Sequence, residues 1–97
     1  MPVEFLEDTV EEIDLALDWY LHRSASAARG FLVEVELGIE RIGKQPELYQ
    51  RYLHGARAYM LKRYPYLLVY RIRNSRIEIV AVAHAKRRPG YWRDRLE

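Results

Sequence analysis

The chain has 97 residues, of which 49% are hydrophobic, and this is enough for one modest core, so we expect a single domain over residues 1–97. It has no cysteine, which excludes a disulfide framework, and its formal net charge is only +2. No apolar run approaches the roughly 20 residues of a membrane span, and residues 1–8 do not resemble a signal peptide, so we expect a soluble, cytoplasmic protein.

The charge is sorted along the chain. Residues 1–49 hold 4 Lys and Arg against 11 Asp and Glu, whereas residues 50–97 hold 12 against 3. The near-neutral total therefore hides an acidic first half and a basic second half. Such an asymmetry favours a surface that binds an anionic partner, either nucleic acid or an acidic protein segment.

The first residues predict a short strand and then a helix. Residues 3–6 are apolar and partly alternating, which favours a strand. From Thr9 onward the apolar residues recur at spacings of three and four, and Asp8 is placed to be the N-cap. We expect the inward face of this helix to carry Val10, Ile13, Leu17, Tyr20 and Leu21. The outward face is then solvated and without a metal or catalytic role, and it carries Glu11, Glu12, Asp14 and Asp18.

A second helix follows a break at residues 24–26, where serine supplies the next N-cap. Its apolar stripe consists of Ala28, Phe31, Val35 and Ile42, widened by Leu32 and Ile39. Gly38 lies in the same stripe, and we expect it to permit close approach of another backbone, that of the first helix. Gly43 and Pro46 end the element, and the short connection makes the two helices an antiparallel hairpin.

After a loop over residues 45–55 the period changes to two, which predicts three strands, over residues 57–62, 66–73 and 76–84. The predicted fold class is therefore α+β in the order β-α-α-β-β-β. The helix hairpin is expected to pack on one face of a small antiparallel sheet.

Asn74 and Ser75 form a two-residue hairpin turn between the last two strands, and this turn fixes their register. The expected opposite pairs are Arg71 with Glu78, Val69 with Val80 and Leu67 with Val82. The face against the helices then carries Tyr66, Leu68, Tyr70, Ile72, Ile77, Ile79, Ala81 and Ala83. The opposite face carries Leu67, Val69, Arg71, Arg73, Arg76, Glu78, Val80, Val82 and His84.

The opposite face is apolar at one end and basic at the turn. No third layer is obvious in the sequence, so we expect the C-terminal tail or a partner to cover the apolar end. The remainder of this face and the cationic tail are expected to stay free for a macromolecule.

Several short motifs occur in a fixed order along the chain. They are Trp19-Tyr20, Pro46, Arg57, Arg63-Tyr64-Pro65-Tyr66, and His84 followed by Arg87-Arg88. Together with the order of the elements, they resemble the RelE/ParE toxin superfamily over nearly the whole chain. The resemblance implies the toxin of a bacterial type II toxin-antitoxin system, also called a plasmid stabilisation protein, which inhibits growth unless a cognate antitoxin neutralises it.

The superfamily has a branch similar to RelE, whose members cleave messenger RNA on the ribosome without metal. In that branch basic residues stand at the positions of Ala58, Met60 and Leu67, none of which can hold a phosphate. The candidate catalytic residues that remain, if the chain is such an endoribonuclease, are His84, Arg87, Arg88 and Tyr91.

The branch similar to ParE instead poisons DNA gyrase by binding it, and the departures at these three positions favour this branch. We expect the mixed face and the tail to bind the target or the antitoxin, through Arg63, Leu67, Val69, Arg71, Val80, Val82, His84, Lys86, Arg87, Arg88, Tyr91, Trp92 and Arg93. The antitoxin is expected to be an acidic, partly disordered chain that folds across apolar grooves in a hetero-oligomer. No cofactor, metal ion or membrane partner is expected.

Several of these residues also have plain structural roles open to them. His84 either acts as an acid or base or packs at a strand end, and the run from Lys86 to Arg88 either holds phosphates or is solvated charge. Tyr91 and Trp92 either stack on a base or close the uncovered sheet face. Three functions stay open: a binding toxin, a RelE-like endoribonuclease, and a non-toxic basic domain that binds nucleic acid without specificity.

Overall fold

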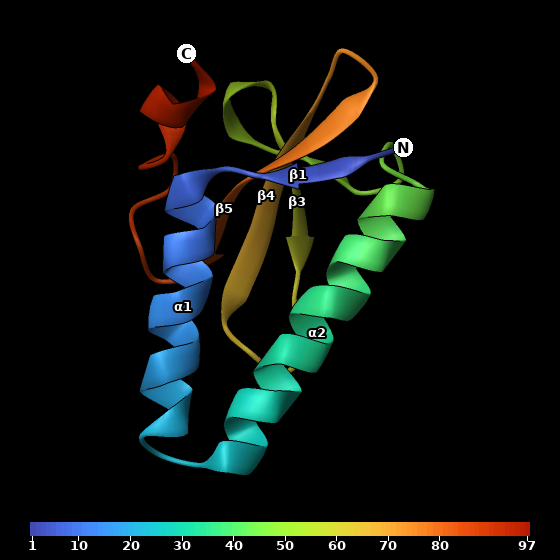
Figure 1. The fold of residues 1–97 in the computed structure, drawn as a ribbon. Helices are drawn as coiled ribbons and strands as arrows, with labels where there is room; N and C mark the ends of the chain where they lie inside the picture. The colour runs from blue at the N-terminus through green and yellow to red at the C-terminus, as the bar shows by residue number, and fades with distance from the viewer.

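Two helices pack against one face of a five-stranded sheet (Figure 1). The structure is a computed structural model and describes residues 1–97. Its elements are β1 (Val3–Phe5), α1 (Glu7–Leu21), α2 (Ala25–Lys44), β2 (Gln50–Arg51), β3 (Arg57–Met60), β4 (Tyr66–Arg73) and β5 (Arg76–His84), with 3-10 helices at Leu53–Gly55 and Arg93–Leu96. The predicted α+β class and element order are confirmed, and the short strand β2 lies in a region that was expected to be loop.

The sheet has the order β1-β5-β4-β3-β2, and it is mixed. Strands β3 to β5 pair antiparallel as expected, and the unexpected β2 pairs antiparallel with β3, whereas β1 runs parallel to β5. Both helices lie between β1 and the next strand, so no tight turn forces β1 into an antiparallel pair. None of the helices has the length and apolarity that crossing a membrane would require.

Helix α2 forms as the sequence predicts. Ser24 is its N-cap, and the Ser24 hydroxyl accepts a hydrogen bond from the backbone N–H of Ala27 at 3.2 Å. Its buried residues are Ala28, Phe31, Val35, Gly38 and Ile42. Gly38, however, approaches the sheet and not α1: a Cβ added there would lie 2.7 Å from Leu68 Cδ1 and 2.9 Å from Tyr59 Cε1.

Helix α1 is rotated relative to the predicted stripe. Ile13 and Tyr20 of that stripe pack against the core as expected, but the fully buried residues are Thr9 and Ala16, and Val10 and Leu21 are exposed. The Thr9 hydroxyl donates a hydrogen bond of 2.7 Å to the carbonyl of Ile79, so this face suits small and polar side chains next to β5. The expected N-cap is also wrong, because Leu6 occupies that position and no side chain caps the helix.

The β4–β5 hairpin turns at Asn74 and Ser75, which have φ angles of 52° and 59°, as a type I′ turn requires. From the turn to the pair of Tyr70 with Ile79 the register is the predicted one. Beyond that pair the register shifts.

The shift is a bulge in β5. Val69 pairs with Ala81, so Val80 is an extra residue on β5, and the predicted pairs Val69–Val80 and Leu67–Val82 are wrong. A one-residue insertion reverses the face to which every later side chain points. Residues 79–83 are all apolar, so no change in the alternation of polar and apolar residues marks this bulge in the sequence.

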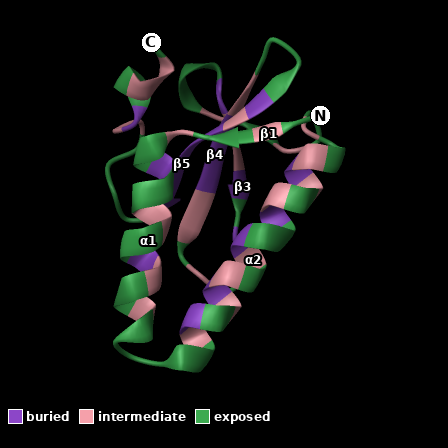
Figure 2. Ribbon diagram, viewed as in Figure 1, coloured by how far each residue is buried: buried purple, intermediate pink, exposed green.

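The bulge changes the composition of both faces. Buried residues are concentrated in β4 and β5 (Figure 2). The core against the helices contains Ala16, Phe31, Val35, Ile42, Tyr59, Leu61, Leu68, Tyr70, Ile77, Ile79 and Val82. A second core, on the other face, contains Ala56, Val69, Val80, Ala81, Ala83 and Trp92. Val82 was therefore assigned to the wrong face, as were Ala81 and Ala83.

Residues 85–97, here called the C-terminal segment, cover the second core. Trp92 is 1% exposed, and its ring lies 6.1 Å from the ring of Tyr52. Of the two coverings expected for the apolar end, the C-terminal tail is the one observed, so this end is closed within the chain. Of the two roles open to Trp92, closing the sheet face is the one observed.

Candidate functional site

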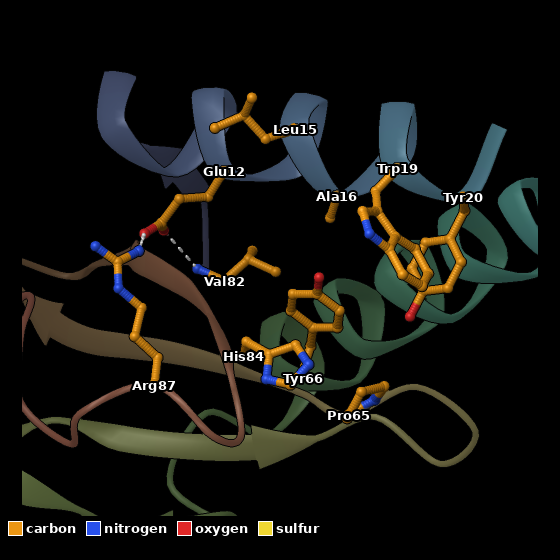
Figure 3. A pocket seen from close by; sticks show the side chains of 10 residues that line it. All are labelled: Glu12, Leu15, Ala16, Trp19, Tyr20, Pro65, Tyr66, Val82, His84 and Arg87. Carbon is orange, nitrogen blue, oxygen red and sulfur yellow. Dashed lines mark hydrogen bonds and ion pairs between the residues drawn. The ribbon is translucent and has the colours of Figure 1, made fainter. Parts of the chain in front are cut away.

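A groove of about 390 Å³ lies between α1 and the end of the β4–β5 hairpin that is remote from the turn (Figure 3). Helix α1 contributes Glu12, Leu15, Ala16, Trp19 and Tyr20. The opposite wall consists of Pro65, Tyr66, Val82, His84 and Arg87. Leu15 and Trp19 are 68% and 50% exposed, so the rim presents large apolar side chains to solvent.

The aromatic end of the groove is held in place by ring contacts. The ring of Trp19 lies edge-on to Tyr20 at 5.0 Å, and the guanidinium of Arg23 lies 3.5 Å from its centre. Tyr20 in turn packs edge-on against Tyr64 and Tyr66. Burial raises the pKa of Tyr20 and of Tyr66, so both phenols stay neutral. The groove thus has a preformed apolar and aromatic end.

Glu12 forms the polar end. Its side chain is 11% exposed and accepts hydrogen bonds from the backbone N–H of Val82 at 3.0 Å and from Arg87 Nη1 at 3.5 Å. Arg95 binds it with both terminal nitrogens, each at 3.0 Å, and Tyr91 donates its hydroxyl at 2.5 Å. The prediction that Glu12 belongs to a solvated face is therefore wrong, because the rotation of α1 turns this carboxylate toward β5.

We call Glu12, Arg87, Tyr91 and Arg95 the Glu12 cluster. Burial, the hydrogen bond to Glu12 and the charge of Glu12 raise the pKa of Tyr91 above that of a free phenol. Burial lowers the pKa of Arg95, but the hydrogen bonds and charge of Glu12 outweigh it and raise the pKa overall. Arg95 therefore stays charged, and Tyr91 stays a neutral donor.

The residues predicted to bind a partner differ in how far they are buried. Four are buried and present no surface: Val69, Val80, Val82 and Trp92. Four are half-buried: Leu67, Arg71, His84 and Tyr91. Five are exposed: Arg63, Lys86, Arg87, Arg88 and Arg93. The groove brings His84 and Arg87 together with Val82, whereas Arg63 lies at a second surface hollow beside α2 and β3.

Arg71 has a structural role. Its Nε donates to Glu78 at 2.6 Å and its Nη1 donates to the carbonyl of Leu96 at 2.7 Å. This side chain therefore ties the C-terminal segment to β4, and its charge is already balanced by Glu78.

His84 lies at the end of β5 with its ring 5.1 Å from that of Tyr66. Its Nδ1 accepts a hydrogen bond from the backbone N–H of Lys86 at 3.1 Å. In the neutral ring the proton is then on Nε2, so this histidine is set up to donate and not to accept at its free nitrogen.

The positions that a RelE-like site would fill with basic residues are apolar neighbours in the sheet. Met60 pairs with Leu67, and Ala58 pairs with the buried Val69. No group of three or more His, Asp or Glu side chains could hold a metal ion. Of the candidate catalytic residues, Arg87 and Tyr91 are engaged by Glu12, and Arg88 stands apart without a side-chain partner.

Sequence reasoning missed Glu12, Leu15 and Arg95 as site residues. The available signal for Glu12 was its spacing of three from Thr9 and four from Ala16, which are the small residues of the true inward face. Arg95 had no local signal, because its partner lies 83 positions away.

Comparisons with known proteins agree with the fold. The sequence model of a family described as "ParE toxin of type II toxin-antitoxin system, parDE" matches residues 3–89. A solved structure described as "Chromosomal ParDE TA system from P. aeruginosa" superimposes with a TM-score of 0.78 at 14% sequence identity, covering 89% of this chain and 97% of that one. No curated protein sequence matches. At this identity, the solved structure supports the fold, and the family match carries the assignment.

Proposed function

The chain belongs to the ParE toxin family of type II toxin-antitoxin systems, and from this premise we propose that it is a toxin that binds a macromolecular target and is neutralised by a cognate antitoxin. DNA gyrase is the target implied by the resemblance to ParE. The observation that carries the proposal is the family match over residues 3–89.

Binding, as opposed to RNA cleavage, is supported by the state of Tyr91. A general base must give up its own proton near neutral pH, but this phenol donates to Glu12 and has a raised pKa. The apolar residues at positions 58, 60 and 67 offer no phosphate contact either. The state of Tyr91 and the apolar strand surface therefore favour binding over cleavage.

Three cations of the C-terminal segment are available for a target. Lys86, Arg88 and Arg93 are exposed, and none of them has an acidic partner. Other basic residues are already neutralised by the acidic first half, as in the pairs Arg76–Glu4 and Arg95–Asp8. Part of the basic charge of the second half is thus neutralised by ion pairs within the chain. In the C-terminal segment, these three cations are the ones left without an acidic partner.

The antitoxin is proposed to occupy the groove of α1. Leu15 and Trp19 supply exposed apolar surface on one side, and Arg87 supplies a half-exposed cation on the other. An amphipathic segment with apolar side chains and a carboxylate complements this arrangement. Binding there would place the antitoxin next to the cationic segment that faces the target.

Induced expression in a bacterial host tests the proposal. We expect growth arrest with a DNA-damage response, intact bulk messenger RNA, and recovery when the cognate antitoxin is co-expressed. Rapid, codon-positioned transcript cleavage would establish the RelE-like alternative instead. Normal growth at confirmed expression would favour the non-toxic basic domain.

Charge variants sharpen the test. Replacing Arg88 and Arg93 together with alanine removes two free cations without breaking an ion pair, so growth arrest should weaken while the fold is retained. The double variant Arg29→Ala and Arg51→Ala is the matched control, because both are exposed cations outside the C-terminal segment with no side-chain partner. Equal loss of toxicity in both variants would contradict a role for the C-terminal cations.

A further inference from the structure

The Glu12 cluster joins three parts of the chain at one carboxylate. Glu12 comes from α1, Val82 from β5, and Arg87, Tyr91 and Arg95 from the C-terminal segment. Five hydrogen bonds converge on the two oxygens of Glu12. Three of the four donor residues lie within residues 87–95, so this one carboxylate fixes most of that stretch.

Arg95 extends the same contact into the sheet. Its Nη1 also donates to the carbonyl of Val80 at 3.0 Å, and its Nε lies 3.5 Å from Asp8. The guanidinium thereby clamps the C-terminal segment between the first turns of α1 and the bulge of β5. A planar fork with two parallel hydrogen bonds to a carboxylate is a geometry that arginine provides and lysine does not.

The cluster also separates the cations of the segment into two groups. Arg87 and Arg95 bind Glu12, and Arg87 stacks on the ring of Tyr91 at 3.6 Å. The remaining cations, Lys86, Arg88 and Arg93, alternate with these anchored residues and face solvent. The distances between these three exposed cations therefore depend on the backbone conformation that the contacts of Arg87 and Arg95 with Glu12 impose.

From this arrangement we propose that Glu12 is a positioning residue for toxicity: it holds residues 86–93 in the conformation that presents Lys86, Arg88 and Arg93 to the target. The inference rests on the proposed function, because it assumes that these cations contact the target. Glu12 itself touches no target, and acts through Arg95 and Tyr91. Pre-ordering the segment lowers the entropy that binding would otherwise cost.

The test breaks the cluster from the tail side, because Arg95 does not line the groove and Glu12 does. In Arg95→Gln we expect amide exchange in residues 85–97 to rise by about ten-fold or more, since a partly buried carboxylate loses its bidentate partner. Growth arrest should fall strongly. Amide exchange in α2 and β3, which lie outside the cluster, should stay unchanged, which shows that the fold persists.

Trp92 reports the conformation directly. The chain has 2 Trp, so Trp19→Phe leaves Trp92 as the sole tryptophan. In this background Arg95→Gln should shift emission to the red and raise quenching by iodide. Arg95→Lys keeps the positive charge but loses the paired hydrogen bonds of the guanidinium to Glu12. We expect its toxicity to lie between that of the wild-type chain and that of Arg95→Gln. Glu12→Gln should reproduce the tail disorder of Arg95→Gln.

Arg29→Gln is the control for a lost positive charge and should change neither the tail nor toxicity. The proposal is overturned if Arg95→Gln leaves the exchange of residues 85–97 unchanged, or if the segment becomes mobile while toxicity is retained. Failure of the proposed function has a different signature. In that case the wild-type chain is not toxic, whereas the exchange and fluorescence experiments still show whether Glu12 orders the segment.

Discussion

The hydroxyl of Tyr91 donates to the carboxylate of Glu12 at 2.5 Å, across 79 positions of sequence. This contact fixes the phenol in its protonated form, because ionisation would place two negative charges side by side. It also ties the C-terminal segment to α1, and so it connects the acid-base state of one side chain to the stability of the second core.

Stability is expected to fall at alkaline pH. The folded state raises the pKa of Tyr91 by burial and by Glu12, and burial raises the pKa of Tyr70 to about 12. Free phenols titrate near pH 10, so above that pH the unfolded chain releases protons that the folded chain retains. The stabilisation is complete below about pH 10 and is lost as pH rises toward the folded pKa values. Urea titrations between about pH 9 and 11 should show a shallower decline for Tyr91→Phe, and an unchanged slope would contradict this account.

Trp92→Ala should destabilise the chain by about 3 to 5 kcal/mol, because Trp92 is 1% exposed and fills the second core. Trp19→Ala is the matched control and should cost about 1 kcal/mol or less, since its ring is half exposed. If Trp92→Ala does not fold, Trp92→Phe provides a milder cavity for the same comparison. Equal costs at the two positions, measured by chemical denaturation, would mean that the tail does not close the sheet.

The two glycines of the second half of α2 should respond in opposite ways to alanine. Gly38→Ala places a Cβ 2.7 Å from Leu68 Cδ1, so overpacking of about 1 to 3 kcal/mol should outweigh the gain in helix propensity of about 1 kcal/mol. At Gly43 the nearest atom is Val3 Cγ2 at an ordinary 3.5 Å, so alanine should stabilise the helix. Thermal denaturation of the two variants decides this, and stabilisation by both would contradict the close approach of α2 to the sheet.

Leu15→Asp should weaken antitoxin binding by about ten-fold or more, because it puts a charge on the apolar rim of the groove. Val10→Asp is the control, since Val10 is also exposed on α1 but does not line the groove. Both substitutions are at exposed positions and should leave the fold intact. Calorimetric titration with the cognate antitoxin gives the two affinities, and equal effects would place the antitoxin elsewhere.

Elements with strong local signals could be predicted from the sequence. The stripe of α2 is regular and its Ser24 cap has the expected chemistry, so both were predicted correctly. The Asn74-Ser75 turn likewise fixed the register of the hairpin as far as Tyr70 and Ile79. In each case neighbours in sequence are also neighbours in space.

The errors arise where distant segments decide the structure. The Val80 bulge leaves no mark on the alternation of β5, yet it moves Val82 onto the helix-facing side. The inward face of α1 is chosen by close packing, which prefers Ala16 and Thr9 over larger apolar residues. The Glu12 cluster depends on both of these features, and for that reason the sequence did not reveal it.

The central claim is that this chain is a binding toxin of the ParE type. The most direct measurement is a supercoiling assay with purified DNA gyrase, the purified chain and its cognate antitoxin. The account predicts inhibition of gyrase by the chain, relief by the antitoxin, and no cleavage of messenger RNA on purified ribosomes. Uninhibited gyrase together with metal-independent cleavage of ribosome-bound messenger RNA would contradict it.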